Sequence, residues 1–387
     1  MSIQMWAYPW DLDAVGVEQA LDEMQAVGVT GVSVATSYHA GRFVEPRLRP
    51  QRLYYPEDGT VHVPVTVGHG AIQPVVSAFG LERPELLAML RRETERRHMA
   101  LASWTVMLHN SRLGAIHPQA TVENAWGGRL RYSLCPSHPA VRSYAVHLAK
   151  ALVRQYDLDV VELESLGYMG LVHEYHHEKD GVGLTAAEQL LAGLCFCSHC
   201  MSRAAAAGVD AEGAREYTRR ALKETLGREV PAPAMALEAL WQVPALSAYW
   251  RWRTDNVHVL IREIKAALPA RTDLRVLDLF GPDEARFYGL DYARVLKDAD
   301  SVCACLYDRP PATVGRAARR LVAVTGGGPG LWAGFRLFVP ENRDRDDFLA
   351  KVGASRAAGV ESLCLYNYGL VPKARLAWIA ALGEAAA

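Results

Sequence analysis

Two glutamates in a short apolar run are the residues of this chain best placed to do chemistry. Residues 159–165 read DVVELES, and the alternation of a β-strand would put Glu162 and Glu164 on one face, roughly 6 to 7 Å apart. Such proximity raises the pKa of one carboxyl group, which favours a general acid that works near neutral pH. The alternative is a salt bridge to an arginine such as Arg336.

A general acid that cleaves a glycosidic bond needs a second carboxyl group across that bond. The two groups are about 5 to 5.5 Å apart in retaining enzymes and about 6.5 to 9.5 Å apart in inverting ones. Asp308 and Asp278 end other apolar runs, whereas Glu341 would need its loop to fold back. We rank Asp308 first, so the predicted catalytic residues are Glu164, Glu162 and Asp308.

Histidines are concentrated in the segment that follows the two glutamates. Residues 167–181 read GYMGLVHEYHHEKDG, with His173, His176 and His177 close together. Residues 173–177 read HEYHH, so that His173 and His177 are four residues apart. We expect these side chains to bind sugar hydroxyls. A divalent metal held by His173, His177 and a carboxylate is the alternative, and it would make the chain a sugar or sugar-acid isomerase or lyase.

Aromatic and polar side chains recur at the ends of other apolar runs. Aromatic faces stack on the apolar faces of sugars, and polar tips bind hydroxyl groups. The expected ligand is therefore a carbohydrate or glycoside, and a sugar-binding barrel without catalysis is a further alternative. The predicted substrate-binding residues, besides the three histidines, are Trp6, Tyr38, His39, Trp104, His109, Asn110, Asp278, Arg336, Tyr366 and Asn367.

Three cysteines lie within six residues, in the sequence CFCSHC. Cys195, Cys197 and Cys200 have the dense soft-ligand spacing of a tetrahedral zinc site, which needs a fourth cysteine or histidine. Cys135 is the best candidate, and His138 and His199 are alternatives. Buried, reduced thiols would be the simpler explanation.

The order of these motifs resembles glycoside hydrolase family 42 and related barrel glycosidases. The chain reads CPSHPAVRSYAVHLAKALVRQYDLDVVELESLGY and later CFCSHC, so that the resemblance covers roughly residues 130–202. It implies a (β/α)8 barrel, a structural zinc on four cysteines (Cys135, Cys195, Cys197 and Cys200) and a glycosidase activity with Glu164 as acid/base. The family often forms homo-oligomers. The chain departs from the family where Leu163 precedes Glu164 and where GFRLFVPEN offers no clear match to the nucleophile.

The elements that must position these residues follow a repeated pattern of apolar run, turn and helix. Eight such runs separated by helices predict a parallel sheet, and eight units in this length predict a closed (β/α)8 TIM barrel. The runs are residues 3–8, 31–37, 100–108, 158–163, 274–280, 302–307, 331–338 and 362–366.

Two long insertions follow the second and fourth predicted strands, on the face where barrel enzymes build their sites. Residues 40–83 contain Asp58-Gly59 between alternating runs, which predicts a β-hairpin. Residues 166–270 carry the cysteine cluster and predicted helices over 185–206, 211–226 and 244–267. We expect one barrel domain over residues 1–387.

Composition excludes several classes of protein. The chain has 387 residues, of which half are hydrophobic, and 42 basic residues balance 43 acidic ones. A nucleic-acid-binding protein would carry a basic excess or patch. No run reaches the roughly 18 to 20 apolar residues of a membrane span, and residues 1–10 lack the features of a signal peptide. We therefore expect a cytoplasmic protein.

Overall fold

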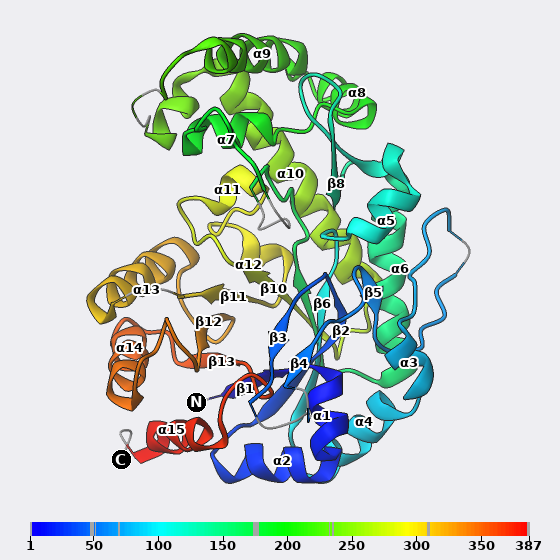
Figure 1. Cartoon of the computed structure of the whole chain (residues 1–387), viewed down its shortest axis with the longest axis vertical. Coiled ribbons are helices and arrows are strands. Elements are labelled where there is room, and N and C mark those ends of the chain that lie inside the picture. The colour runs from blue at the N-terminus through cyan, green and yellow to red at the C-terminus, as the bar shows by residue number, and fades with distance from the viewer. Residues whose placement is uncertain are drawn as a thin grey trace.

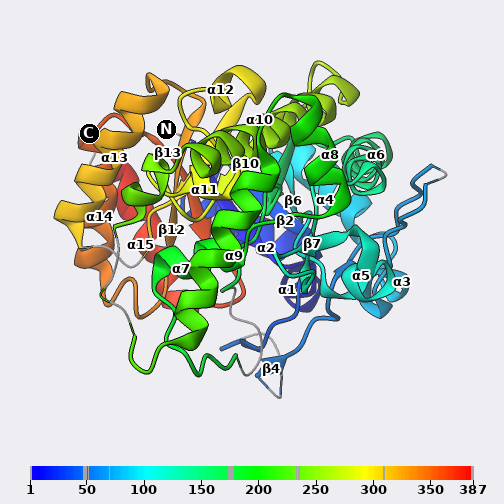
Figure 2. The ribbon, with the colours of Figure 1, turned by 90° about the horizontal axis from the view of Figure 1, so that it is seen from above.

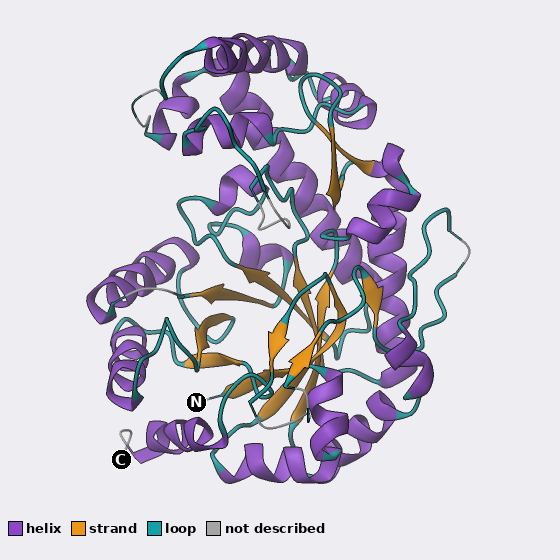
Figure 3. Cartoon of the chain, viewed as in Figure 1, coloured by secondary structure: helices purple, strands orange, loops and turns teal. Residues whose placement is uncertain are grey.

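Eight parallel strands form the centre of the molecule and close into a barrel (Figures 1 and 3). The computed structural model describes residues 2–46, 50, 52–68, 70–172, 178–231, 233, 236–307 and 310–384. The first strand pairs with both the second and the last, which closes the barrel and confirms the predicted (β/α)8 fold. The barrel strands are β1 Ile3–Ala7, β2 Gly31–Tyr38, β6 Ala100–Val106, β9 Val160–Glu164, β10 Asp273–Asp278, β11 Ser301–Cys305, β12 Leu331–Arg336 and β13 Ser362–Tyr366.

Helices surround the barrel and fill most of the connections between its strands. The long helix before β9 begins at Pro139, where a missing N–H costs no hydrogen bond, and ends at Asp157 in the left-handed conformation. The helices that cover the barrel are α1 Pro9–Val15, α2 Val17–Ala26, α4 Leu86–Arg96, α6 Pro139–Tyr156, α10 Pro244–Ala267, α11 Ala285–Tyr288, α12 Val295–Asp298, α13 Pro311–Thr325, α14 Arg345–Ala357 and α15 Lys373–Glu384.

The strands have two different faces, as the period of two requires. Along β1, Ile3 and Met5 pack in the large layer between the sheet and the helices, whereas Trp6 belongs to a separate inner cluster. Three cysteines of the later strands, Cys303, Cys305 and Cys364, are also in that inner cluster. The strand faces that point into the barrel therefore carry aromatic rings, thiols and the two glutamates.

The insertion after β2 does not form the predicted hairpin at Asp58-Gly59. The strands before and after this turn have different partners: β4 Leu53–Tyr54 pairs with β3 Phe43–Val44, whereas β5 Thr60–Val61 pairs with the end of β2. Gly59 does adopt a positive φ of 62°, as a turn at this position requires. The turn was located correctly, but β5 finds its partner in the barrel sheet. A short helix, α3 Ala78–Glu82, follows.

The insertion after β9 is helical, and its helices gather at one end of the molecule. It contains α7 Ala186–Ala192, α8 Ser198–Ala206 and α9 Ala211–Gly227, followed by a 3-10 turn at Leu237–Gln242 and then α10, which runs back along the barrel. Figure 1 shows α7, α8 and α9 at the top of the view, and Figure 2 looks down on them. The helix predicted over 185–206 is broken at residues 193–197, where the cysteines begin.

A β-ribbon that the sequence analysis did not predict lies before α6. The short helix α5 Ser111–Ile116 and a 3-10 turn at Pro118–Ala120 lead into β7 Thr121–Glu123, which pairs antiparallel with β8 Arg129–Leu134. Cys135 immediately follows this ribbon. Across the described part of the chain, no helix combines the length and apolar character that crossing a bilayer demands.

Candidate active site

Glu164 ends β9 and lies among aromatic side chains inside the barrel. Its carboxylate accepts a hydrogen bond from the indole N–H of Trp104 on the neighbouring strand β6, with 2.6 Å between Nε1 and Oε2. The residue is only 8% exposed, and burial raises its pKa to about 7. The negative charge of Glu162 raises this pKa further, while the Trp104 hydrogen bond lowers it. Glu164 can therefore hold or release a proton near neutral pH.

Glu162 faces the same interior, two residues deeper, but it is completely buried and fully engaged. Its Oε1 accepts hydrogen bonds from Trp6 Nε1 and from Ser33 Oγ, the latter at 3.1 Å. Its Oε2 lies 3.3 Å from Nη1 of Arg275, whose side chain is itself buried. Three donors, one of them a guanidinium, therefore hold the Glu162 carboxyl group in place.

Arg275 is the partner of Glu162 that the sequence analysis missed. It lies on β10 directly opposite Glu162 in the strand register, donates to Gln4 and Ser301, and stacks on the Trp332 ring at 3.8 Å. Parallel pairing of β9 with β10 was the signal that could have identified it.

The arginine that we considered for this salt bridge, Arg336, binds elsewhere. It pairs with Glu341, so the loop after β12 does fold back, and its guanidinium lies 4.3 Å from the Tyr307 ring. The alternative of a salt bridge to an arginine is therefore confirmed for Glu162, but the partner is Arg275 and not Arg336. The structure instead places Glu341 beside the end of β12.

An aromatic wall surrounds the Glu164 carboxylate. Trp104 packs against Tyr38 with ring centres 5.2 Å apart and edge-to-face against Tyr366 at 5.7 Å. Trp6 lies 6.1 Å from Tyr366, and the hydroxyls of Tyr8 and Tyr366 are 2.5 Å apart. Four predicted substrate-binding residues from β1, β2, β6 and β13 are thus brought together at one place.

Two histidines continue this wall outward from the barrel. His39 stacks on Tyr38 at 4.2 Å, and His109 lies 4.3 Å from His39. The side chains of the predicted site residues Asn110 and Asn367 form hydrogen bonds with the backbone instead. Asn110 caps α5 through Leu113 N and donates to Gly59 O, and the side-chain oxygen of buried Asn367 accepts a hydrogen bond from Gly369 N.

Asp278 and Glu164 both line a small cavity at the carboxyl ends of β9 and β10. Leu277 belongs to the inner cluster, so the alternation of β10 turns Asp278 toward the helices. There its Oδ2 accepts hydrogen bonds from Tyr292 OH at 2.9 Å and from the backbone N–H groups of Phe280 and Gly281. Burial raises its pKa to about 6. These contacts shape the loop after β10.

Four predicted site residues lie outside the described residues: Asp308, His173, His176 and His177. Their roles stay predictions.

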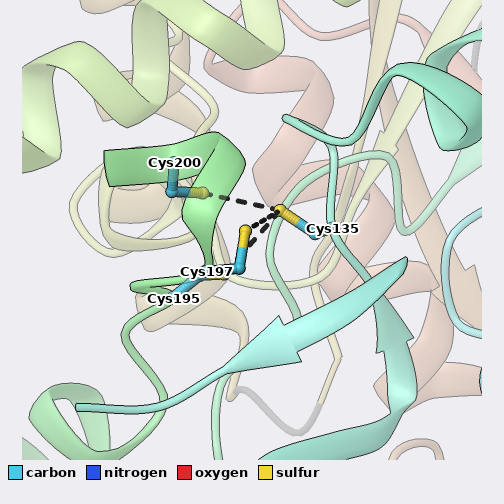
Figure 4. A group of neighbouring side chains, drawn as sticks. All are labelled: Cys135, Cys195, Cys197 and Cys200. Carbon is cyan, nitrogen blue, oxygen red and sulfur yellow. Dashed lines mark hydrogen bonds between the residues drawn. The ribbon is translucent and has the colours of Figure 1, made fainter. Parts of the chain in front are cut away.

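The four predicted metal ligands come together in one buried cluster (Figure 4). The Sγ atom of Cys135 is 3.7, 3.6 and 3.5 Å from those of Cys195, Cys197 and Cys200. All four sulfur atoms lie within 4.8 Å of one another. A tetrahedral metal with metal–sulfur bonds of about 2.3 Å would separate its ligands by roughly 3.8 Å. The cluster therefore fits a tetrahedral metal ion.

Surrounding polar groups hold the cysteines in place. The backbone N–H of Glu123 in β7 points at Cys195 Sγ, and Ser137 Oγ lies 3.2 Å from Cys200 Sγ. His138 and His199, the alternative ligands, pack against each other with ring centres 4.4 Å apart. Cys135 follows the β7–β8 ribbon while the other three cysteines belong to the long insertion. A bound ion would therefore join these two segments.

Comparison with known proteins supports the fold. No family model matches this chain, and its sequence matches no curated protein. Solved glycoside hydrolases nevertheless share its architecture. The glycoside hydrolase domain of PgaB (BpsB) from Bordetella bronchiseptica is 13% identical with a TM-score of 0.55, and the match covers 95% of this chain and 94% of that domain.

Two β-galactosidases match almost the whole chain. The enzyme from the Antarctic haloarchaeon Halorubrum lacusprofundi is 16% identical, and Gan42B, a family 42 enzyme from G. stearothermophilus, is 14% identical. Both have a TM-score of 0.59 and cover 99% of this chain, which spans only 58% and 56% of their lengths. The resemblance to family 42 is thus confirmed at the level of the barrel fold.

Proposed function

We propose that this chain is a glycoside hydrolase in which Glu164 donates a proton to the glycosidic oxygen. One observation carries the proposal: a carboxyl group with a pKa of about 7 lies at the carboxyl end of β9, where barrel enzymes place catalytic groups. A general acid must be protonated at the working pH, and burial among aromatic rings supplies that condition.

The surrounding side chains suit a sugar. Trp104, Tyr38 and Tyr366 present aromatic faces and polar tips beside the carboxyl group. Tyr366 is only partly buried, and Glu164 keeps a small exposed fraction, so a glycosidic oxygen can approach from the open end of the barrel.

The second carboxyl group is proposed to be Asp308 or Glu341. Glu162 is a poor candidate, because it is completely buried beneath Glu164 and is paired with Arg275. Glu341 gains support from the fold of its loop, which brings it to Arg336 at the end of β12. Asp308 remains the first candidate, because it follows β11 in the sequence and would lie at the carboxyl end of the barrel. In Asp308→Ala and Glu341→Ala variants, rescue of turnover by azide, which would occupy the space of the missing carboxylate, would identify the nucleophile of a retaining mechanism.

The test of the proposed activity is hydrolysis of a panel of aryl α- and β-glycosides. Wild type should release the aryl group, and Glu164→Gln should lower turnover by about 10²- to 10⁴-fold on substrates that need a protonated leaving group. Glu229→Gln changes an exposed carboxylate and is the matched control. Full activity of Glu164→Gln would remove the assignment, and a panel without any turnover would favour sugar binding without catalysis.

We also propose that the four-cysteine cluster binds a structural zinc ion. Four protein thiolates leave no open coordination position, so the ion would join the β7–β8 ribbon to the insertion without acting on substrate. Elemental analysis should find one zinc per chain, lost in Cys135→Ser and retained in Cys303→Ser. Within the described ranges, no other group of ligands could hold a metal. A second equivalent of metal would favour the isomerase or lyase alternative.

A further inference from the structure

A groove of 320 Å³ lies beside the barrel, in the insertion after β2. This volume is at the lower end of the range of about 300 to 1,000 Å³ typical of small-molecule sites. The groove runs along α3, which Figure 1 shows on the side of the barrel opposite α13 and α14. Its walls come from α1, β4, α3 and the segments between them, and they consist of Asp13, Tyr54, Tyr55, Glu57, His62, Ser77, Ala78, Phe79, Glu82 and Arg83.

One polar group of the groove wall is buried without a partner. His62 is 2% exposed, and its Nδ1 lies 3.1 Å from Ser77 Oγ, whereas its Nε2 has no hydrogen-bond partner among the described residues. Burial lowers the pKa of His62 to about 3, so the ring is neutral. An unpaired buried polar atom costs roughly 1 to 3 kcal/mol, which a ligand hydroxyl would offset.

The walls of the groove combine aromatic rings with carboxylates. Tyr55 and Phe79 offer apolar faces, and Glu82 offers oxygen atoms that accept hydrogen bonds, whereas Glu57 already accepts one from Ala78 N. Arg83 is paired with Asp13 through both carboxylate oxygens, and Arg112 outside the wall pairs with Glu57, so that among the described residues Glu82 supplies the uncompensated charge. The net negative charge disfavours anionic ligands.

We propose that this groove is a second saccharide-binding site that accepts an uncharged or amino-substituted sugar unit. Aromatic faces bind the apolar side of a pyranose, while the carboxylates and His62 bind its hydroxyl or ammonium groups. Uronic acids and sulfated sugars are excluded by charge. The proposal extends the glycosidase assignment but does not depend on it, because sugar binding here needs no catalysis.

Packed rings separate this groove from Glu164. Trp10 contacts His62 at 5.1 Å on one side and stacks on Tyr8 at 4.7 Å on the other. Tyr8 in turn lies 5.4 Å from Trp104, which binds Glu164. Trp10 and Tyr8 are completely buried, so packed rings keep the two sites distinct.

The experiment follows the imidazole resonance of His62 in full-length Glu164→Gln labelled with ¹⁵N-histidine. The signal is assigned by its loss in His62→Gln. Methyl β-galactoside or glucosamine should shift the His62 signal saturably, whereas galacturonate should not. Tyr55→Ala and Glu82→Gln, both at exposed positions, are then added to the Glu164→Gln protein. Together they should raise the sugar concentration that gives half of the full shift of the His62 signal by at least about tenfold.

Trp126→Ala is the matched control, because it removes an exposed aromatic ring from the β7–β8 turn and should leave the titration unchanged. A His62 signal that does not move with any neutral or amino sugar would overturn the proposal. An equal response to galacturonate would also overturn it. If the aryl glycosides are not hydrolysed but the His62 signal moves, the groove proposal stands and the glycosidase assignment falls.

Discussion

Two glutamates on one face of β9 have opposite surroundings. Glu162 is held by Arg275, Trp6 and Ser33 in the closed interior of the barrel. Glu164, one step nearer the open end, has a single hydrogen bond within the described residues, from Trp104, and its pKa is raised to about 7. The residue type and the strand are the same, so the difference comes from the neighbouring strands.

The two surroundings suit two different roles: Glu162 belongs to the packed interior of the barrel, whereas Glu164 can take part in proton transfer. Glu162 is paired with Arg275, so removing either partner leaves the other buried without compensation. Glu164 is buried, which raises its pKa, and Glu162 below it adds to this effect. The deeper glutamate therefore raises the pKa of the outer one.

The largest expected effect is on stability. Glu162→Gln leaves the Arg275 guanidinium buried without its carboxylate, and we expect the free energy of unfolding at pH 7 to fall by about 3 to 5 kcal/mol. Glu164→Gln breaks no ion pair and should cause no loss. Urea unfolding of both variants measures the difference. Adding Arg275→Met to Glu162→Gln should recover part of the loss, and equal destabilisation by the two glutamine variants would contradict the contrast.

The second largest effect should be on how the free energy of unfolding changes with pH, because of the raised pKa of Glu164. Because the folded pKa of Glu164 is about 7 and its ordinary value is 4.5, the folded state keeps a proton that the unfolded chain has released between these values. Wild type should therefore lose stability relative to Glu164→Gln as the pH rises from about 4.5 to 7, by roughly 3 kcal/mol in total. Parallel curves for the two proteins, from urea unfolding at fixed pH, would refute this.

A smaller effect should follow removal of the hydrogen bond that Trp104 donates to Glu164. The indole N–H of Trp104 stabilises the ionised carboxylate, so Trp104→Phe should raise the pKa of Glu164 by up to about one unit. The alkaline limb of the pH dependence of kcat/KM should move upward by the same amount. Trp332→Phe changes a ring that contacts Arg275 and should leave the limb in place. A downward shift in Trp104→Phe would show that this bond favours the acid.

The barrel could be predicted because its strands are local apolar runs. The run predicted at residues 158–163 is β9 Val160–Glu164, and alternation along it correctly put both glutamates on one face. The four clustered cysteines could also be predicted, since three lie within six residues, Cys135 was the best candidate for the fourth, and the resemblance implied the same set.

Contacts between distant segments could not be predicted in the same way. Arg275 is more than a hundred residues from Glu162, and only the pairing of β9 with β10 brings them together. Asp58-Gly59 was expected to join two paired strands, but Thr60 and Val61 pair with β2 instead. In both cases the local sequence pattern predicts where a strand lies, but its partner strand depends on how the whole barrel sheet closes.

The most direct test of the central claim is ¹³C NMR titration of the glutamate side-chain carboxyl groups. Wild type should show one carboxyl that titrates near pH 7, and this transition should be absent in Glu164→Gln. It should persist at a lower pH in Glu162→Gln, because the neighbouring charge is gone. A transition near pH 7 that survives in Glu164→Gln, or titration of Glu164 near 4.5, would contradict the account.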